Sequence, residues 1–293
     1  YGSYTLGMDV GYELDLWGRV RQNVTAGVES AKAAQADLES ARLSLQAQLT
    51  ESVLVLRALD RDRAILDEAV AAYAKALELV RARVQGGIAP GMDASRAETQ
   101  LESARSLSRQ AAAQRALVEH SIAALVGESA STFSMPPRVV EHALPVVPLG
   151  VPSELLQRRP DVAAAQRRMA AANASVGVAQ AAFFPTVNLA GSIGYQSSNF
   201  SRFIRAPNLF WAVGPAMFLS LFDGGRRDAE VARTRAVLEE SAARYRGVAL
   251  GAFQQVEDGL ALLANYGEAA ESERRALAAA ERTLQLATTR YRE

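Results

Sequence analysis

The chain has 293 residues, of which 49% are hydrophobic, so it is long enough to bury a sizeable core. It carries 32 basic and 32 acidic residues, and the basic ones are scattered among the acidic ones, which argues against a nucleic-acid partner. The absence of cysteine excludes disulfides, thiolate metal sites and cysteine nucleophiles.

The first element is a strand predicted over residues 3–17, in which hydrophobic and polar residues alternate. Because successive side chains of a strand point to opposite faces, Asp9 and Glu13 share the polar face. Alternation with aromatic residues near both ends is typical of a lipid-facing barrel strand, although a sheet packed on a soluble core also alternates. We expect Asp9 and Glu13 to face a lumen and the apolar residues to face lipid: Tyr4, Leu6, Met8, Val10 and Tyr12.

Residues 18–127 are predicted to form a long helical hairpin. Apolar residues recur at steps of three and four, which indicates a coiled-coil seam with left-handed supercoiling. The seam positions are Leu45, Leu49, Leu56, Leu59, Leu66, Val70, Tyr73, Leu77, Val80 and Val84.

The tip of this hairpin is predicted at Gly86, Gly87, Ile88, Ala89, Pro90 and Gly91. Its glycine spacing is that of a phosphate-binding loop, but Met92 and Asp93 stand where such a loop needs Lys and Ser or Thr. The segment therefore ends one helix, and Asp93 is a candidate N-cap of the next.

The rest of the chain is predicted as an irregular proline-rich connection over 128–152, a helix over 153–184, two strands over 185–222 and a second long helix over 223–293. In the second strand of the pair, Pro215 suits only a sheet edge or a bulge. The longest apolar run, 209–222, is shorter than the roughly 20 residues that a membrane helix needs. Any contact with a bilayer is therefore expected through strands.

An internal duplication relates the two ends of the chain. Gly18 and Arg19 recur as Gly225 and Arg226 (225 − 18 = 207), and the same offset places Leu56 on Leu263 without a gap. Both copies run from a strand through a Gly-Arg turn into a long helix. This repeat favours a tube wall built of similar staves over a globule with a single core.

Catalysis finds little support in the sequence. The two histidines, His120 and His142, have no ligand-like spacing to each other or to carboxylates, so neither an enzyme nor a cofactor is expected. A helical scaffold or tethering protein remains open as an alternative, whereas a hydrolase lacks a nucleophile and base.

Four stretches of the sequence resemble the TolC-like outer-membrane factors, in particular the lipoprotein branch that serves resistance-nodulation-division efflux pumps. They are Tyr12-Glu-Leu-Asp-Leu-Trp-Gly-Arg-Val-Arg21, Gly150-Val-Pro-Ser-Glu-Leu-Leu-Gln-Arg-Arg-Pro-Asp161, Ala171-Ala-Asn-Ala-Ser-Val-Gly-Val-Ala-Gln-Ala-Ala-Phe-Phe-Pro185 and Leu221-Phe-Asp-Gly-Gly-Arg226. The resemblance covers the whole chain.

By this resemblance the fold would be mainly α with membrane β, as a homotrimer. Each subunit would give four strands to one outer-membrane β-barrel and long helices to a periplasmic α-barrel. Residues 1–293 would be an internal fragment, with one strand and its helix before Tyr1 and a last helix after Glu293. The resemblance implies an outer-membrane exit duct for drugs or other small solutes, or alternatively a type I secretion exit channel.

The resemblance also implies partners and a gate. A periplasmic adaptor would bind the tip at 86–91, with an inner-membrane efflux pump behind it. Tyr291 would donate a hydrogen bond to Asp93 and so latch the periplasmic end shut, because a phenol–carboxylate bond is strong yet reversible. Alternatively, Tyr291 continues the apolar seam as the repeat mate of Val84 and Asp93 only caps a helix.

Overall fold

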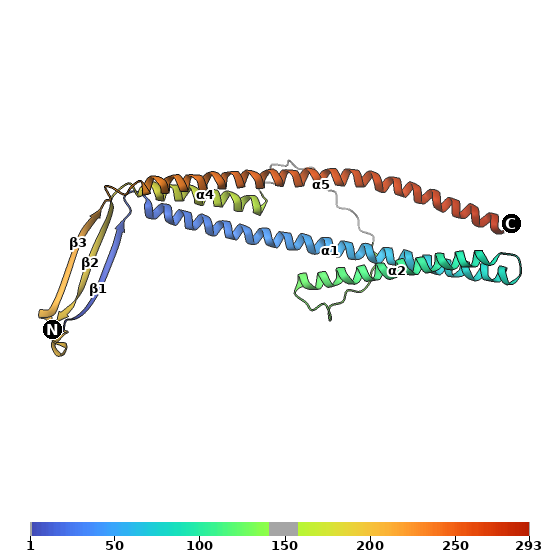
Figure 1. The fold of residues 1–293 in the computed structure, drawn as a ribbon, viewed down its shortest axis with the longest axis horizontal. Helices are drawn as coiled ribbons and strands as arrows, with labels where there is room; N and C mark the ends of the chain where they lie inside the picture. Colours follow the sequence, from blue (N-terminus) through green and yellow to red (C-terminus); the bar gives the residue numbers. More distant parts are fainter. Residues whose placement is uncertain (1, 141–157, 293) are drawn as a thin grey trace. The chain divides into compact units, whose positions relative to one another are not determined.

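The computed structural model describes residues 2–140 and 158–292 (Figure 1). The chain divides into two compact units, Tyr1–Ser40 with Gly150–Glu293, and Ala41–Leu149. Helix α1 (Arg19–Gln85) contributes its first part to the first unit and its remainder to the second.

The first unit contains a three-stranded antiparallel sheet in the order β1-β2-β3. Strand β1 (Tyr4–Leu14) pairs with β2 (Thr186–Ser197), which pairs with β3 (Leu209–Phe218). The short helices η1 (Phe200–Arg202) and η2 (Ala206–Asn208) connect β2 to β3. Both ladders are continuous, and Pro215 lies on β3, an edge strand of this sheet, where proline is tolerated.

The duplication is visible in the two longest helices. Helix α1 and helix α5 (Arg226–Arg292) begin 207 positions apart (226 − 19 = 207), which is the offset of the repeat. Each follows a left-handed glycine, Gly18 at φ 77° and Gly225 at φ 86°, a conformation that other residues rarely adopt. The predicted fold class, mainly helical with a few strands and an internal repeat, is confirmed.

Aspartates at equivalent turns secure the start of both long helices. The Asp15 carboxylate accepts hydrogen bonds from the backbone N–H groups of Val20 at 2.9 Å and Arg21 at 3.0 Å. The Asp223 carboxylate accepts from the N–H groups of Gly225 at 3.1 Å and Arg227 at 3.2 Å. These bonds satisfy N–H groups that a helix start otherwise leaves unpaired.

Helix α4 (Pro160–Ala181) packs against α5 in the first unit through small side chains. Its buried residues are Val162, Ala164, Ala165, Ala172, Ala174, Val176, Ala179 and Ala181. Arg167 pairs with Glu29 at 3.1 Å and Arg168 pairs with Asp37, so salt bridges join α4 to the first part of α1. The earlier part of the helix predicted over 153–184, up to residue 157, lies outside the described residues.

The second unit is a helical hairpin formed by the remainder of α1 and helix α2 (Gly91–Val126). Its core includes Leu56 and Leu77 of the predicted seam, with Leu101 and Ile122 of α2. The prediction that Asp93 caps α2 was wrong, because the helix begins at Gly91 and its N-cap is Pro90. Pro90 takes an extended conformation that its ring favours, so the helix begins three residues earlier than predicted and Asp93 lies in the first turn, where a negative charge still suits the helix dipole.

Candidate functional site

The pairing register collects the hydrophobic side chains of all three strands on one face of the sheet. Leu6 lies opposite Tyr195, Met8 opposite Ile193, and Ile193 in turn opposite Trp211. Directly opposed residues of an antiparallel pair point to the same face. This apolar face therefore comprises Tyr4, Leu6, Met8, Val10, Tyr12 and Leu14 of β1, Val187, Leu189, Ile193 and Tyr195 of β2, and Leu209, Trp211, Val213, Pro215 and Met217 of β3.

These side chains are not covered within the chain. Leu6 is 59% exposed and Trp211 is 71% exposed, and most of the other large members of the apolar face are also exposed. A contiguous exposed patch of this kind marks a surface that contacts a protein or a membrane. The alternation in residues 3–17 is thus part of a face that spans three strands.

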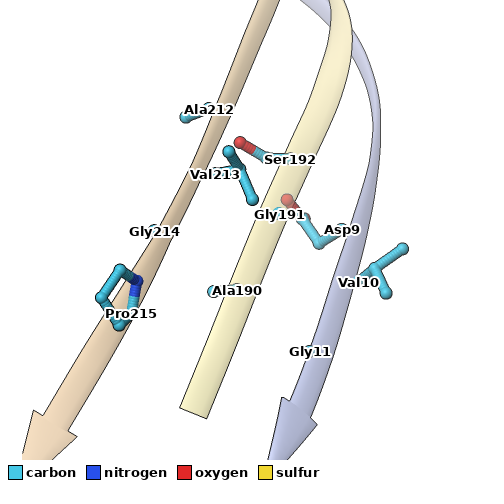
Figure 2. A pocket seen from close by; sticks show the side chains of 10 residues that line it. All are labelled: Asp9, Val10, Gly11, Ala190, Gly191, Ser192, Ala212, Val213, Gly214 and Pro215. Carbon is cyan, nitrogen blue, oxygen red and sulfur yellow. The ribbon is translucent and has the colours of Figure 1, made fainter.

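The opposite face of the sheet is mostly polar or small, with Phe210 and Phe218 of β3 as its large apolar residues. It carries Asp9 and Glu13 of β1, with Asn188, Ser192 and Gln196 of β2. A hollow on the sheet is lined on this face by Asp9, Ser192 and small residues of β2 and β3 (Figure 2). The register thus places the two predicted acidic residues, Asp9 and Glu13, on the face opposite Val10.

Gly7, Gly194 and Phe210 pack closely against one another on this polar face. Gly7 and Gly194 are paired across β1 and β2, and Phe210 is the β3 partner of Gly194. A Cβ atom at Gly194 would lie 2.7 Å from the Gly7 Cα and 2.8 Å from the Phe210 Cζ, so no larger residue fits there. The sequence does not predict this contact, because only the strand register brings the three residues together.

A second contact that the sequence analysis missed joins the strands to the helices. The Trp17 Nε1–H donates a hydrogen bond to the Pro185 carbonyl at 2.8 Å, and the Trp17 ring stacks on Phe184 with 4.7 Å between centroids. The Arg227 guanidinium lies over the Phe183 ring at 5.3 Å. The turn between β1 and α1 is therefore joined to the link between α4 and β2, and this link also contacts the start of α5.

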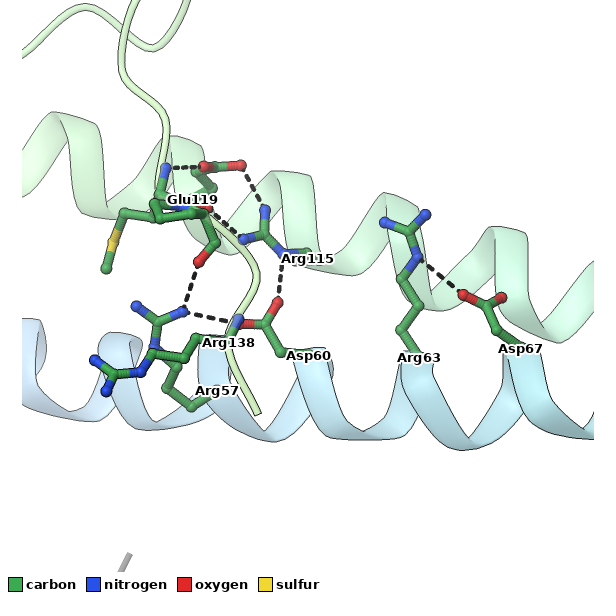
Figure 3. Close-up of polar contacts among 9 residues, drawn as sticks. Arg57, Asp60, Arg63, Asp67, Arg115, Glu119 and Arg138 are labelled. Carbon is green, nitrogen blue, oxygen red and sulfur yellow. Dashed lines mark hydrogen bonds and ion pairs between the residues drawn. The ribbon is translucent and has the colours of Figure 1, made fainter. Parts of the chain in front are cut away.

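In the second unit, four charged residues form a buried cluster, the hairpin clamp, which consists of Arg57, Asp60, Arg115 and Glu119 (Figure 3). The Asp60 carboxylate accepts from Arg57 at 2.9 Å and from Arg115 at 2.7 Å, and its side chain is 1% exposed. Arg115 also pairs with Glu119 at 2.8 Å. Two positive and two negative charges thus compensate one another around the buried side chains of Asp60 and Arg115, as buried charges require.

The hairpin clamp holds the backbone of the segment that follows α2. Arg115 donates to the Met135 carbonyl at 2.6 Å, and Arg57 donates to the Pro136 carbonyl at 3.0 Å. The backbone N–H of Arg138 donates to Asp60 at 3.0 Å. Burial of Asp60 raises its pKa, but this N–H and the two guanidinium groups outweigh burial and hold the pKa below its ordinary value.

The hairpin tip is a tight turn with an exposed apolar residue. Gly87 has φ 72° and open space around it, and Ile88 is 80% exposed. Asp93 is half-buried in the first turn of α2. Tyr291 lies on α5, but its side chain falls outside the described residues, so its contact with Asp93 stays a prediction.

Across residues 2–140 and 158–292, no helix is both long enough and apolar enough to span a membrane.

The family model and similar known proteins point to the same family. The sequence profile of the outer membrane efflux protein family matches residues 1–128 and 151–293. The chain is 30% identical to the outer membrane protein OprJ of Pseudomonas aeruginosa, over 99% of this chain and 61% of OprJ. It is also 30% identical to TtgC of Pseudomonas putida, a probable efflux pump outer membrane protein, over 99% of this chain and 60% of TtgC.

Solved structures agree with the sequence matches. A crystal structure of a membrane protein from Pseudomonas aeruginosa superposes with a TM-score of 0.92 at 30% identity, covering 99% of this chain and 68% of that one. The chain spans about 60% of the length of the curated relatives it matches.

Proposed function

Because the chain belongs to the outer membrane efflux protein family, we propose that it forms most of one subunit of an outer-membrane exit duct in a tripartite efflux system. The duct passively conducts drugs or other small solutes across the periplasm and the outer membrane, and catalyses no reaction. The observation that carries this proposal is the unbroken apolar face across β1, β2 and β3, backed by a polar face. A lipid-facing wall around an aqueous lumen needs this division.

The assembly follows from the open edges of the sheet. Strands β1 and β3 each leave one edge unpaired in the described sheet, and unpaired backbone groups are not tolerated against lipid. Closure then requires strands from other copies of the chain and from the rest of the full-length protein. We propose a homotrimer with four strands per subunit, in which the polar face that holds Asp9 and Glu13 lines the lumen.

The partners attach at the hairpin tip, where α1 ends and α2 begins. The exposed Ile88, held on the glycine turn, is the apolar contact for a periplasmic adaptor. The adaptor in turn couples the duct to an inner-membrane pump. Near the same turn, Asp93 accepts a hydrogen bond from Tyr291 and holds the duct closed at rest. The exposed side of the tip and the half-buried position of Asp93 support these roles.

The proposal is tested by efflux in a Gram-negative strain that lacks its own exit duct. The full-length protein, expressed with its cognate adaptor and pump, should restore resistance to several unrelated drugs and should fractionate with the outer membrane. A pump variant without proton-coupled activity serves as the control for passive leakage. A full-length protein that stays soluble without detergent would overturn the duct and support the helical scaffold.

A further inference from the structure

Asp9 occupies an open position on the polar face of the sheet. It lies opposite Ser192 in the register and between two glycines of β1, Gly7 and Gly11. The neighbouring positions Ala190, Ala212 and Gly214 are also small, so the carboxylate is left exposed in a hollow, beside the Ser192 hydroxyl (Figure 2). The bulkier residues of the hollow, Val10, Val213 and Pro215, belong to the opposite face of the sheet in the register, so they do not cover the charge.

Glu13 lies on the same face but, unlike Asp9, forms an ion pair. The Arg19 Nε donates to its Oε1 at 2.9 Å, and a second bond from the same guanidinium reaches Oε2. This bidentate pair compensates the Glu13 charge. Among the described residues, no ion pair or hydrogen bond involves the Asp9 side chain, and the β2 and β3 positions of this face are uncharged.

We propose that Asp9 gives the strand-lined part of the duct a preference for cations, an inference that rests on the proposed function. In a homotrimer three uncompensated carboxylates stand at the same height of the lumen, and rings of acidic side chains favour cations in channels. Small cations therefore pass this part of the duct more readily than small anions. Val10, the next residue, faces the opposite side and contributes no charge.

The reach of this effect depends on salt. The screening length is about 30 Å at 0.01 M ionic strength and about 3 Å at 1 M. The Asp9 charges therefore influence the whole lumen in dilute salt and only its wall in concentrated salt. A preference that fades with salt is the signature of a surface charge, whereas a narrow binding site would persist.

The test is the permeability ratio of K⁺ to Cl⁻ through the full-length trimer in planar bilayers, measured from the reversal potential in a KCl gradient. Near 0.01 M the native ratio should exceed that of Asp9→Asn roughly threefold, and Asp9→Arg should favour Cl⁻. Ser192→Ala, in the same hollow but without a change of charge, should keep the native ratio. Near 1 M all four proteins should converge.

Equal ratios for the native protein and Asp9→Asn in dilute salt, with channels still present, would overturn the Asp9 proposal and leave the duct intact. A native ratio unaffected by salt would overturn it as well, without reliance on any variant. Absence of conductance from the native trimer would instead remove the proposed function on which the inference rests.

Discussion

Replacing Asp60 by alanine should release the segment that follows α2 from the helical hairpin. The substitution removes an acceptor that is 1% exposed and serves two guanidinium groups and the backbone N–H of Arg138. Breaking a buried pair by deleting one partner costs about 3–5 kcal/mol. Arg57 is 14% exposed, so water reaches part of it, and Arg115 keeps Glu119. We therefore expect the low end, about 3 kcal/mol.

The assay is hydrogen exchange of the full-length trimer in detergent, followed in peptides that span 133–140. A loss of about 3 kcal/mol corresponds to exchange faster by roughly 100-fold. Asp67→Ala is the matched control, because Asp67 lies two turns further along α1, is 55% exposed and pairs with Arg63 at 3.7 Å (Figure 3). Exposed pairs contribute about 0–1 kcal/mol. Equal protection in native protein and Asp60→Ala would refute the reasoning.

Three further predictions concern the sheet, the tip and the latch, and a fourth concerns pH. Val10→Arg, if near the bilayer midplane, should destabilise the trimer by about 2–4 kcal/mol in thermal unfolding, whereas Asp9→Arg should mainly alter conductance; equal losses would contradict the face assignment. Gly87→Trp should abolish efflux but leave trimers in the membrane, because φ 72° suits glycine; full drug resistance would remove the tip as the adaptor site. Tyr291→Phe and Asp93→Ala should each make the isolated channel leakier to large antibiotics, and the double variant little worse; additive effects would leave no latch. Because the pKa of Asp60 is lowered in the folded chain, the clamp's contribution should be complete above the ordinary value of 3.8 and be lost only as pH falls below it, which melting of native protein and Asp60→Ala across pH tests.

Local signals predicted much of the fold. The glycines at 18 and 225 mark where the long helices begin, and the repeat offset carries the start of one helix onto the start of the other, so the existence and the starts of α1 and α5 followed from the sequence. The period-2 pattern of β1 predicted which residues share a face, since the pleat leaves no alternative once the strand forms. Asp93 was misplaced as a cap because the extended conformation of Pro90 already begins α2 at Gly91.

The hydrophobic pattern of the sequence does not predict contacts between residues that lie far apart along the chain. Asp60 contacts Arg115 and the backbone of Arg138 only after the chain has turned at the tip. In the sequence, Asp60 and Arg63 are both charged residues close to the apolar seam, and nothing in the pattern tells the buried one from the exposed one. The second repeat carries Ala264 and Gly267 where the first has Arg57 and Asp60 (264 − 57 = 207 and 267 − 60 = 207). This divergence of otherwise similar copies was the available signal that the first hairpin binds something its counterpart does not.

The central claim is that this chain forms part of the wall of a trimeric membrane duct. The mass of the full-length protein, extracted from outer membranes in mild detergent and measured with the detergent contribution subtracted, tests it most directly. The account predicts a single species with three times the subunit mass, because the open edges of β1 and β3 must be closed by other strands. A stable monomer, with or without detergent, would contradict it.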